Sequence, residues 1–249
     1  MNPPRKVSSL RHFRAPAQDN IAPGPAKNNG RLVGVIADRA ALAHATRLRR
    51  PPDFFELRLD ALRDSLGEIE RALPFLPAPL ILTARHPAEN GRGSLNVSAR
   101  HALLRRFLPQ AHGIDLELRS AQAMRSLIAE ARHRKIQLIL SSHDFRDTPT
   151  AELLREQLQT AIAGGADIFK IATRTDNAAQ LDRLLTFFHE SSEHFPIAAM
   201  GIGKLGVASR REFLRLGSAL NYAAIGKPNA AGQPTLAQLR RTRAAYTNQ

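Results

Sequence analysis

The stretch AELLREQLQTAIAGGADIFKIAT, residues 151–173, decides the fold. Its first part places Leu, Ile and Ala at intervals of three and four residues with charges between them, which predicts an amphipathic helix. Gly164 and Gly165 are typical of a helix end. The run DIFKIAT at 167–173 is short, apolar and β-branched, as a fully buried strand is. A helix followed directly by a buried strand indicates a parallel α/β sheet.

Seven further runs of the same kind predict strands at 31–37, 53–59, 79–85, 113–118, 136–142, 196–202 and 222–226. Their starts lie about 22 to 34 residues apart, which is the length of one strand–helix unit. Eight such units favour an α/β fold closed into a (β/α)8 TIM barrel, for which 249 residues are enough. A doubly wound open sheet shows the same alternation, but no Gly-x-Gly-x-x-Gly follows the first strand.

The chain divides at about residue 30 by composition. Residues 1–30 are basic, rich in Pro and Asn and without periodicity, so we expect a flexible arm. Its Arg and Ser content faintly resembles a transit peptide, but the prolines and the lack of an amphipathic helix disfavour that interpretation. Residues 31–249 then form a single catalytic barrel domain.

Composition narrows the function classes. The chain has no cysteine, which excludes disulfides and thiolate metal sites and favours a cytoplasmic setting, and no apolar run is long enough for a membrane span. The net charge of +14 invites a nucleic-acid hypothesis. However, the arginines are scattered singly through helical stretches, and only two tyrosines and no tryptophan are present to stack bases. We therefore interpret the arginines as surface cations whose field attracts an anionic small-molecule substrate.

Lys170 lies in the middle of the apolar strand at 167–173. A buried ammonium is costly, so a lysine there either lifts its charge to water along its methylenes or is kept neutral as a nucleophilic amine. Taken alone, the stretch favours the first interpretation. The second would have Ile168, Phe169 and Ile171 keep the amine dry.

Polar residues late in the predicted strands favour the second interpretation, because active sites of such barrels lie at the carboxyl ends of the strands. These residues are Glu56, Arg58, Arg85, Asp115, Glu117, His143 and Lys170. Glu56, Arg58 and Asp60 alternate and should point the same way, although they could also form a purely structural ion-pair layer. An imidazole beside a reactive amine is the expected pairing for imine chemistry. We interpret His44, His101, His112 and His133 as surface residues.

Two loops complete the predicted site. The segment MGIGKLGVASR at 200–210 ends in an arginine at the start of a helix, where backbone amides and a guanidinium would bind an anion. The loop GKPNAAGQPT at 226–235 carries Gln233 and could close over a ligand. No His-Glu-x-x-His, calcium loop or Gly-x-Ser-x-Gly is present, so we predict no metal and no serine nucleophile.

Together these motifs resemble one family, the type I 3-dehydroquinate dehydratases. The likeness runs from about residue 31 to the C-terminus through ELRLD, TARHPAENG, IDLEL, SSHDF, IFKIAT, MGIGKLGVASR and AGQP, in the family's order. The resemblance implies a (β/α)8 barrel, commonly a homodimer, that converts 3-dehydroquinate to 3-dehydroshikimate in the shikimate pathway of aromatic amino acid biosynthesis. It implies no metal and no organic cofactor. The charge pattern and the apolar runs separately predict no nucleic-acid partner and no membrane partner.

The resemblance also implies residue roles. Lys170 corresponds to the Schiff-base lysine, His143 to the general acid and base, and Glu89 to the acidic partner of that histidine. The substrate-binding positions carry over to Glu56, Arg58, Arg85, Arg210, Asn229 and Gln233. Here NAAGQ stands where the family usually has SAPGQ, so Asn229 replaces a serine and Ala231 a proline. The amide can still form a hydrogen bond but is bulkier than a hydroxyl, and a loop without that proline is looser.

Other functions remain open at this level. A class I aldolase or transaldolase also uses a barrel lysine, and a catalytically impaired basic barrel could carry the same fold.

Overall fold

A computed structural model of the protein describes residues 30–228 and 230–247. It contains a sheet of eight parallel strands in the order β7-β6-β5-β4-β3-β2-β1-β8. The strands are β1 (Arg31–Ile36), β2 (Phe54–Arg58), β3 (Leu80–Thr83), β4 (Ala111–Glu117), β5 (Gln137–Asp144), β6 (Ile168–Arg174), β7 (Ile197–Ile202) and β8 (Leu220–Ala224). The amide of Ala219, just before β8, donates to the carbonyl oxygen of Ile197 at the start of β7 (2.8 Å), so the two ends of the sheet meet and the barrel is nearly closed.

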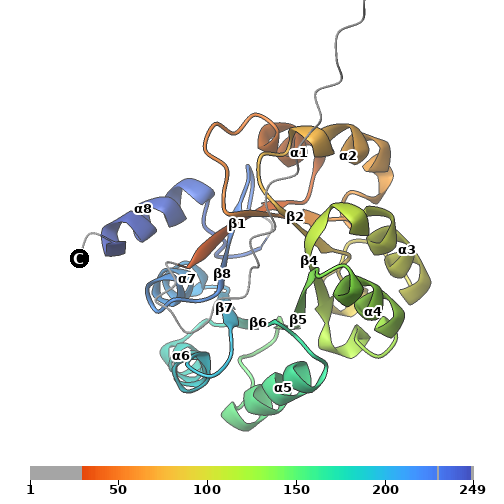
Figure 1. Ribbon diagram of the computed structural model, residues 1–249. Helices are drawn as coiled ribbons and strands as arrows, with labels where there is room; N and C mark the ends of the chain where they lie inside the picture. The colour runs from red at the N-terminus through yellow and green to blue at the C-terminus, as the bar shows by residue number, and fades with distance from the viewer. Residues whose placement is uncertain (1–29, 229, 248–249) are drawn as a thin grey trace, which may run out of the picture.

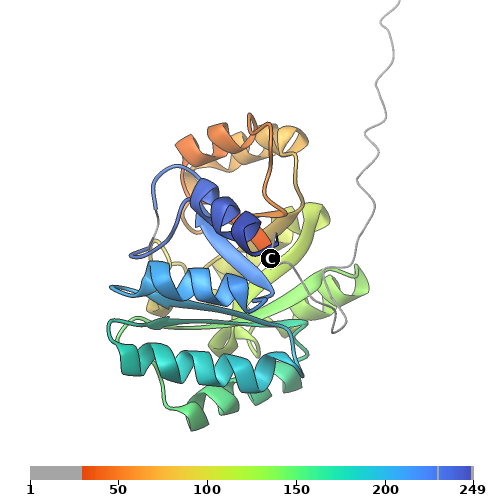
Figure 2. The same cartoon turned by 90° about the vertical axis from the view of Figure 1, so that its left-hand side faces the viewer.

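A helix follows each strand, and the helices surround the strands (Figure 1). They are α1 (Arg39–Ala45), α2 (Leu66–Ala72), α3 (Val97–Phe107), α4 (Arg125–His133), α5 (Ala151–Ala163), α6 (Ala178–Ser192), α7 (Gly206–Arg215) and α8 (Leu236–Thr247). Short 3-10 turns are η1 (Arg63–Ser65), η2 (Leu73–Phe75), η3 (Pro87–Glu89), η4 (Leu108–Gln110) and η5 (Leu118–Ser120). In Figure 2, α5 and α6 run side by side along one flank of the barrel.

The predicted barrel is confirmed, and every predicted strand bound lies within two residues of the observed one. Local chemistry sets the helix starts. The side chain of Thr150 accepts the amide of Leu153 (3.3 Å) to cap α5, and Asn177 and Gln180 form a reciprocal capping box at α6. After α5, Gly165 adopts a φ of 77°, which favours glycine, and turns the chain into β6. The predicted arm lies in 1–29, outside the described residues, apart from Gly30.

Two apolar layers hold the barrel together. Side chains such as Val33, Ile139 and Ile168 fill its interior. Phe169 and Ile171 belong to the larger layer between the strands and the helices. Because side chains of a strand alternate between faces, Lys170 points into the barrel. The expectation that Phe169 and Ile171 surround the amine is therefore wrong, since both face the helices.

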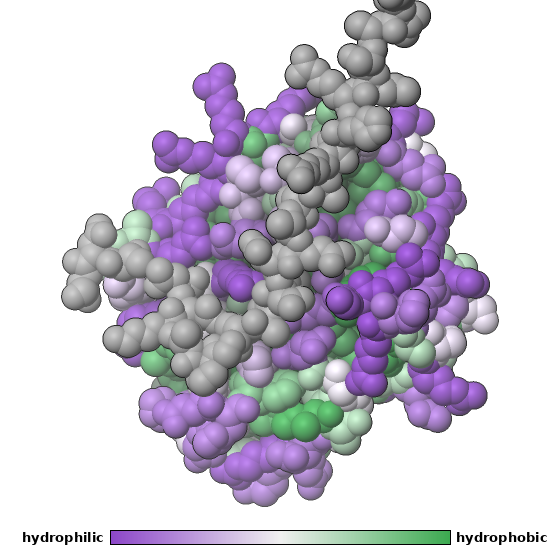
Figure 3. All heavy atoms as spheres, viewed as in Figure 1, coloured by the Kyte–Doolittle hydropathy of each residue, from purple (hydrophilic) through white to green (hydrophobic). Residues whose placement is uncertain are grey.

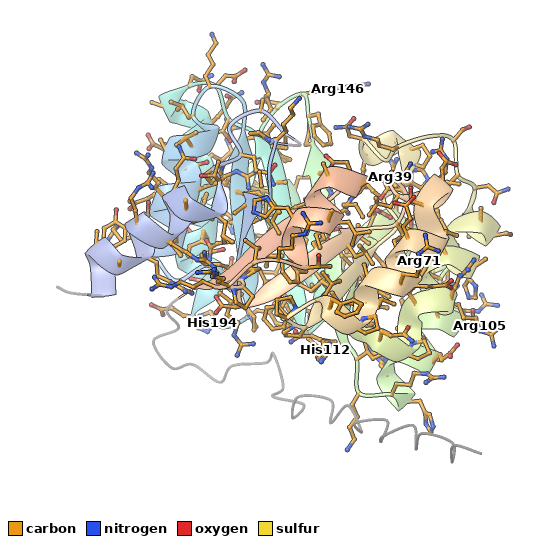
Figure 4. The ribbon with its side chains drawn as sticks, turned by 90° about the horizontal axis from the view of Figure 1, so that it is seen from above. Arg39, Arg71, Arg105, His112, Arg146 and His194 are labelled. Atoms are coloured by element: carbon orange, nitrogen blue, oxygen red, sulfur yellow. The ribbon has the colours of Figure 1, made fainter. Side chains whose placement is uncertain are left out.

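The face of the molecule seen in Figure 3 is mostly hydrophilic. In Figure 4, Arg146, which follows β5, lies at the opposite end of the barrel from His112 and His194. His112 corrects one expectation: it lies in β4, is half-buried and accepts the amide of Leu80 on Nδ1 (3.3 Å). Within 30–228 and 230–247, no helix has the length and apolar character that crossing a membrane needs.

Candidate active site

A cavity opens at the carboxyl ends of the strands and is lined by side chains from most of them. It contains eight of the nine predicted site residues: Glu56, Arg58, Arg85, Glu89, His143, Lys170, Arg210 and Gln233. The ninth, Asn229, lies outside the described residues. Asn90, Met200 and Tyr222 also line the cavity, and the sequence analysis missed them. The alternation of side chains along β8 and β7 could have identified Tyr222 and Met200, because it points both into the barrel.

Lys170 projects from the inner face of β6 and is only 3% exposed. Its Nζ lies 2.7 Å from Oδ2 of Asp115, 3.4 Å from Oε1 of Glu56 and 3.9 Å from the centroid of the Tyr222 ring. The amine is therefore neither lifted into solvent nor enclosed by apolar groups alone. It lies in a buried polar cluster, where ion pairs offset the cost of taking the charge out of water.

Arg85, just after β3, ties the cluster together. Its guanidinium donates to both carboxylate oxygens of Asp115 (3.1 and 2.9 Å), to Glu117 (3.2 Å) and to the hydroxyl of Ser141 (2.8 Å). Burial opposes both charges, yet mutual attraction raises the pKa of Arg85, and Arg85 and Lys170 lower the pKa of Asp115 well below its ordinary value. Both groups therefore stay ionised at neutral pH.

Glu89 is brought to His143 by the turn after β3. η3 is followed by Asn90, whose φ of 62° reverses the chain. His86, just before η3, is fixed by donating its amide to Oε1 of Glu117 (2.8 Å). Oε2 of Glu89 then lies 2.9 Å from Nδ1 of His143 and accepts the backbone amide of the same residue (3.1 Å). The carboxylate thus orients the imidazole and leaves Nε2 for another partner.

Burial and charge set the protonation of this pair. Burial and the nearby Glu117 raise the pKa of Glu89 to about 7, against the opposing effect of Arg85. Burial, Arg85 and Lys170 lower the pKa of His143 well below its ordinary value. The imidazole is therefore neutral at neutral pH and can accept a proton.

Arg58 and Asp60 form an ion pair with each other, as the structural interpretation of these residues allowed. β2 ends at Arg58, whose guanidinium donates to both oxygens of Asp60 (3.0 and 2.9 Å). Asp60 also accepts the amides of Arg85 (3.2 Å) and Arg92 (2.9 Å), so it holds the turn after β3. Glu56 behaves differently, because it accepts the hydroxyl of Thr83 (2.8 Å) and faces the amine.

Arg210 is a buried cation with no carboxylate partner in the part of the chain that the structure describes. It lies one turn inside α7 rather than at its start, and is 6% exposed. Nη1 contacts the carbonyl oxygen of Tyr222 (3.3 Å) and the sulfur of Met200 (3.4 Å). Within the described residues it forms no ion pair, and Nε has no hydrogen-bond partner. Burial lowers the pKa of Arg210 to about 10, so it remains charged at neutral pH and is suited to bind an anion.

Gln233 reaches the cavity from the loop after β8. The loop packs on the turn after β7, where Gly203 donates its amide to the carbonyl oxygen of Ala231 (3.3 Å). Gly232 has a φ of 76°, and a Cβ there would lie 2.7 Å from the Cα of Gly206. Two glycines therefore allow the two loops to touch.

The chain matches known proteins along most of its length. The model of the type I 3-dehydroquinase family matches residues 34–248. A 3-dehydroquinate dehydratase of Salmonella choleraesuis (strain SC-B67) is 34% identical over 187 residues, which are 73% of each chain.

Solved structures agree in fold. The 3-dehydroquinate dehydratase of Geobacillus kaustophilus HTA426 superposes with a TM-score of 0.81 at 22% identity, covering 92% of this chain and 98% of that one. The enzyme of Enterococcus faecalis gives a TM-score of 0.75 at 27% identity, over 88% and 95% of the two chains.

Proposed function

The chain belongs to the type I 3-dehydroquinase family, and on that premise we propose that it dehydrates 3-dehydroquinate to 3-dehydroshikimate through a Schiff base on Lys170. It is an enzyme of the hydro-lyase class. The observation that carries the mechanism is the shared cavity, in which the buried amine of Lys170 and the neutral imidazole of His143 both face the same space. The step belongs to the shikimate pathway of aromatic amino acid biosynthesis.

The first step is formation of the imine. The free amine of Lys170 adds to the C3 ketone of the substrate, and the resulting carbinolamine loses water to give an iminium. The ammonium in the ion pair first gives a proton to water, and a proton returns to the carbinolamine oxygen when that oxygen leaves as water. Asp115 remains ionised and fixes the Nζ, while Glu56 lies on its other side at 3.4 Å.

The second step is elimination. The iminium withdraws electrons, so the C2 proton becomes acidic enough for the imidazole of His143 to remove it. The enamine then expels the C1 hydroxyl, which leaves as water after taking the proton back from the imidazolium. Water hydrolyses the conjugated imine, which releases the enone product and restores the amine. Oε2 of Glu89, 2.9 Å from Nδ1, orients the ring for both proton transfers.

Substrate binding is assigned by charge and position. Arg210, which forms no ion pair among the described residues, supplies a guanidinium for the substrate carboxylate, and Arg58, Glu56 and Gln233 line the space for the ring hydroxyls. Arg85 bonds to three side chains already, so we assign it chiefly to fixing Asp115. A homodimer in the cytoplasm is proposed by analogy with the family.

The test combines product formation and trapping. Purified protein mixed with 3-dehydroquinate should generate the ultraviolet absorbance of a conjugated enone. If the absorbance does not rise, the proposed dehydratase function is wrong. Borohydride added during turnover should leave one reduced substrate adduct on Lys170 by mass spectrometry. Lys170→Ala should abolish both signals, while Lys135→Ala, at an exposed lysine of the barrel's rim, should keep them. An aldolase would also trap a ketone on Lys170, but it would form no enone from this substrate.

A further inference from the structure

Arg100 is a charged side chain that is fully buried outside the cavity. It lies on α3, is 0% exposed, and does not line the active-site cavity. Nε donates to the carbonyl oxygen of Ala84 (2.7 Å), Nη1 to the hydroxyl of Ser120 (3.0 Å), and Nη2 to the Glu117 carboxylate. The scattered helical arginines were expected on the surface, so Arg100 corrects that interpretation. A guanidinium is buried this completely only where its partners offset the loss of water.

The carboxylate of Glu117 connects Arg100 to the active site. Oε2 accepts from Arg100 and from the hydroxyl of Ser120 (3.0 Å). Oε1 accepts from Nη1 of Arg85 (3.2 Å) and from the amide of His86 (2.8 Å). Both oxygens are thus fully used. One oxygen meets Arg100, and the other holds the turn that carries Glu89.

The negative charge of Glu117 affects the pKa of Glu89. After burial, Glu117 is the strongest influence that raises the pKa of Glu89. Arg100 partly neutralises Glu117 and so limits this effect. The other charged or titratable groups around the Glu89–His143 pair are Arg58 on β2, Arg85 after β3, Asp115 on β4, Arg119 on η5 and Lys170 on β6.

We propose that Arg100 is a positioning residue that acts through Glu117: it sets the charge that the Glu89–His143 pair meets, and thereby the pH above which the pair can take a proton from the substrate. The inference deepens the proposed dehydratase function and depends on it for the substrate, but not for the titration of the pair.

The sign follows from the charges. Without Arg100, only Arg85 pairs with the Glu117 carboxylate, so more of its negative charge reaches Glu89, and a nearby negative charge favours the protonated form of Glu89. Arg100→Gln should therefore move the acidic limb of the kcat/KM profile to higher pH, by about 0.5 to 1 unit at low salt. Adding Glu117→Gln removes this negative charge and should return the limb towards its parent position. Arg100→Lys keeps the charge but cannot form three planar bonds, so kcat should fall while the limb stays.

The same shift can be measured without turnover. The ring resonances of His143, assigned by their absence in His143→Asn, should report proton uptake by the pair in the substrate-free protein. They should move with Arg100→Gln and return with the added Glu117→Gln. If the parent does not convert 3-dehydroquinate, the proposed function fails, but this titration still decides the role of Arg100. Arg105→Gln, an exposed arginine of the same helix, is the matched control and should leave the titration unchanged.

An acidic limb and ring titration that stay in place in folded Arg100→Gln would overturn the proposal. So would a shift that the added Glu117→Gln leaves uncorrected. Circular dichroism and thermal unfolding establish which variants are folded. If Arg100→Gln does not fold, the Lys variant and the double variant carry the test, and a limb displaced in both of them would overturn it.

Discussion

Nδ1 of His143 lies 2.9 Å from Oε2 of Glu89, and the same oxygen accepts the backbone amide of His143. One carboxylate oxygen thus fixes both the ring and the strand that carries it. The arrangement is useful for catalysis but costly for folding. Burial raises the pKa of Glu89 from 4.5 to about 7, which means that its ionised form is poorly accommodated in the folded protein.

We therefore expect Glu89→Gln to stabilise the protein above neutral pH. Between 4.5 and about 7 the folded state holds more protons than the unfolded state, so the Glu89 contribution to stability falls as pH rises through this window. The neutral amide removes the penalty, which reaches at most ~3 kcal/mol above that window. Thermal unfolding at about pH 5 and about pH 8 should show a gain only at the higher pH.

Glu152→Gln is the matched control. Glu152 is exposed at the start of α5, and its own backbone amide and Thr150 lower its pKa, so its charge adds stability as pH rises. Removing that charge should reduce stability at the higher pH, which is the opposite sign. Equal gains for Glu89→Gln at both pH values would contradict the assignment.

His143→Ala should separate the two chemical steps. Addition of the amine to the ketone depends less on the imidazole than elimination does, so the imine should still form and then stall. Turnover should fall by roughly 100-fold to 10,000-fold, the usual loss for a general acid and base. Borohydride should nevertheless trap the substrate on Lys170. His133→Ala, on the exposed side of α4, should behave as the parent does. A variant that neither turns over nor traps would assign His143 to imine formation instead.

The contact between the loops after β7 and β8 predicts an effect of glycine substitutions. Gly232 and Gly226 both have positive φ, at 76° and 82°, but a Cβ at Gly226 would meet nothing within 4 Å, whereas one at Gly232 would meet the backbone of Gly206 at 2.7 Å. Gly226→Ala should cost only the backbone strain of about 1–2 kcal/mol. Gly232→Ala should cost more and also raise KM, because the neighbouring Gln233 must shift. Equal stability and equal KM in the two variants would show that the loops tolerate separation.

The sequence predicted the barrel well because the positions of the strands follow from local apolar runs and from glycines at helix ends. It also placed Lys170 and His143 at one end, since parallel strands share their carboxyl edge. It could not predict partners that come from distant strands, such as the pairing of Lys170 with Asp115. Arg100 shows the limit most clearly. In VSARHALLRRF it resembles its exposed neighbours Arg105 and Arg106, and only packing against β3 and η5 distinguishes it.

A substitution of Arg210 should affect substrate binding and stability in different ways. It is a buried cation without a carboxylate partner among the described residues, so in the free protein it costs stability. Arg210→Met keeps an apolar side chain of similar length and removes the charge. We expect the variant to unfold at the same temperature as the parent or higher. Its KM for 3-dehydroquinate should rise by roughly 10-fold to 100-fold or more, the loss expected for charge-assisted hydrogen bonds to a carboxylate.

The neighbouring residue supplies the control for long-range attraction. Arg211 is exposed on the same helix, and Arg211→Met removes the same charge from the basic surface without touching the cavity. The KM of Arg211→Met should change little at physiological salt, because salt screens the attraction between an exposed charge and a substrate in the cavity. If Arg210→Met and Arg211→Met raise KM equally, the substrate is drawn by the general field of the protein. If only Arg210→Met does so and its unfolding temperature does not fall, the buried guanidinium is kept for the substrate carboxylate at the expense of the free protein's stability.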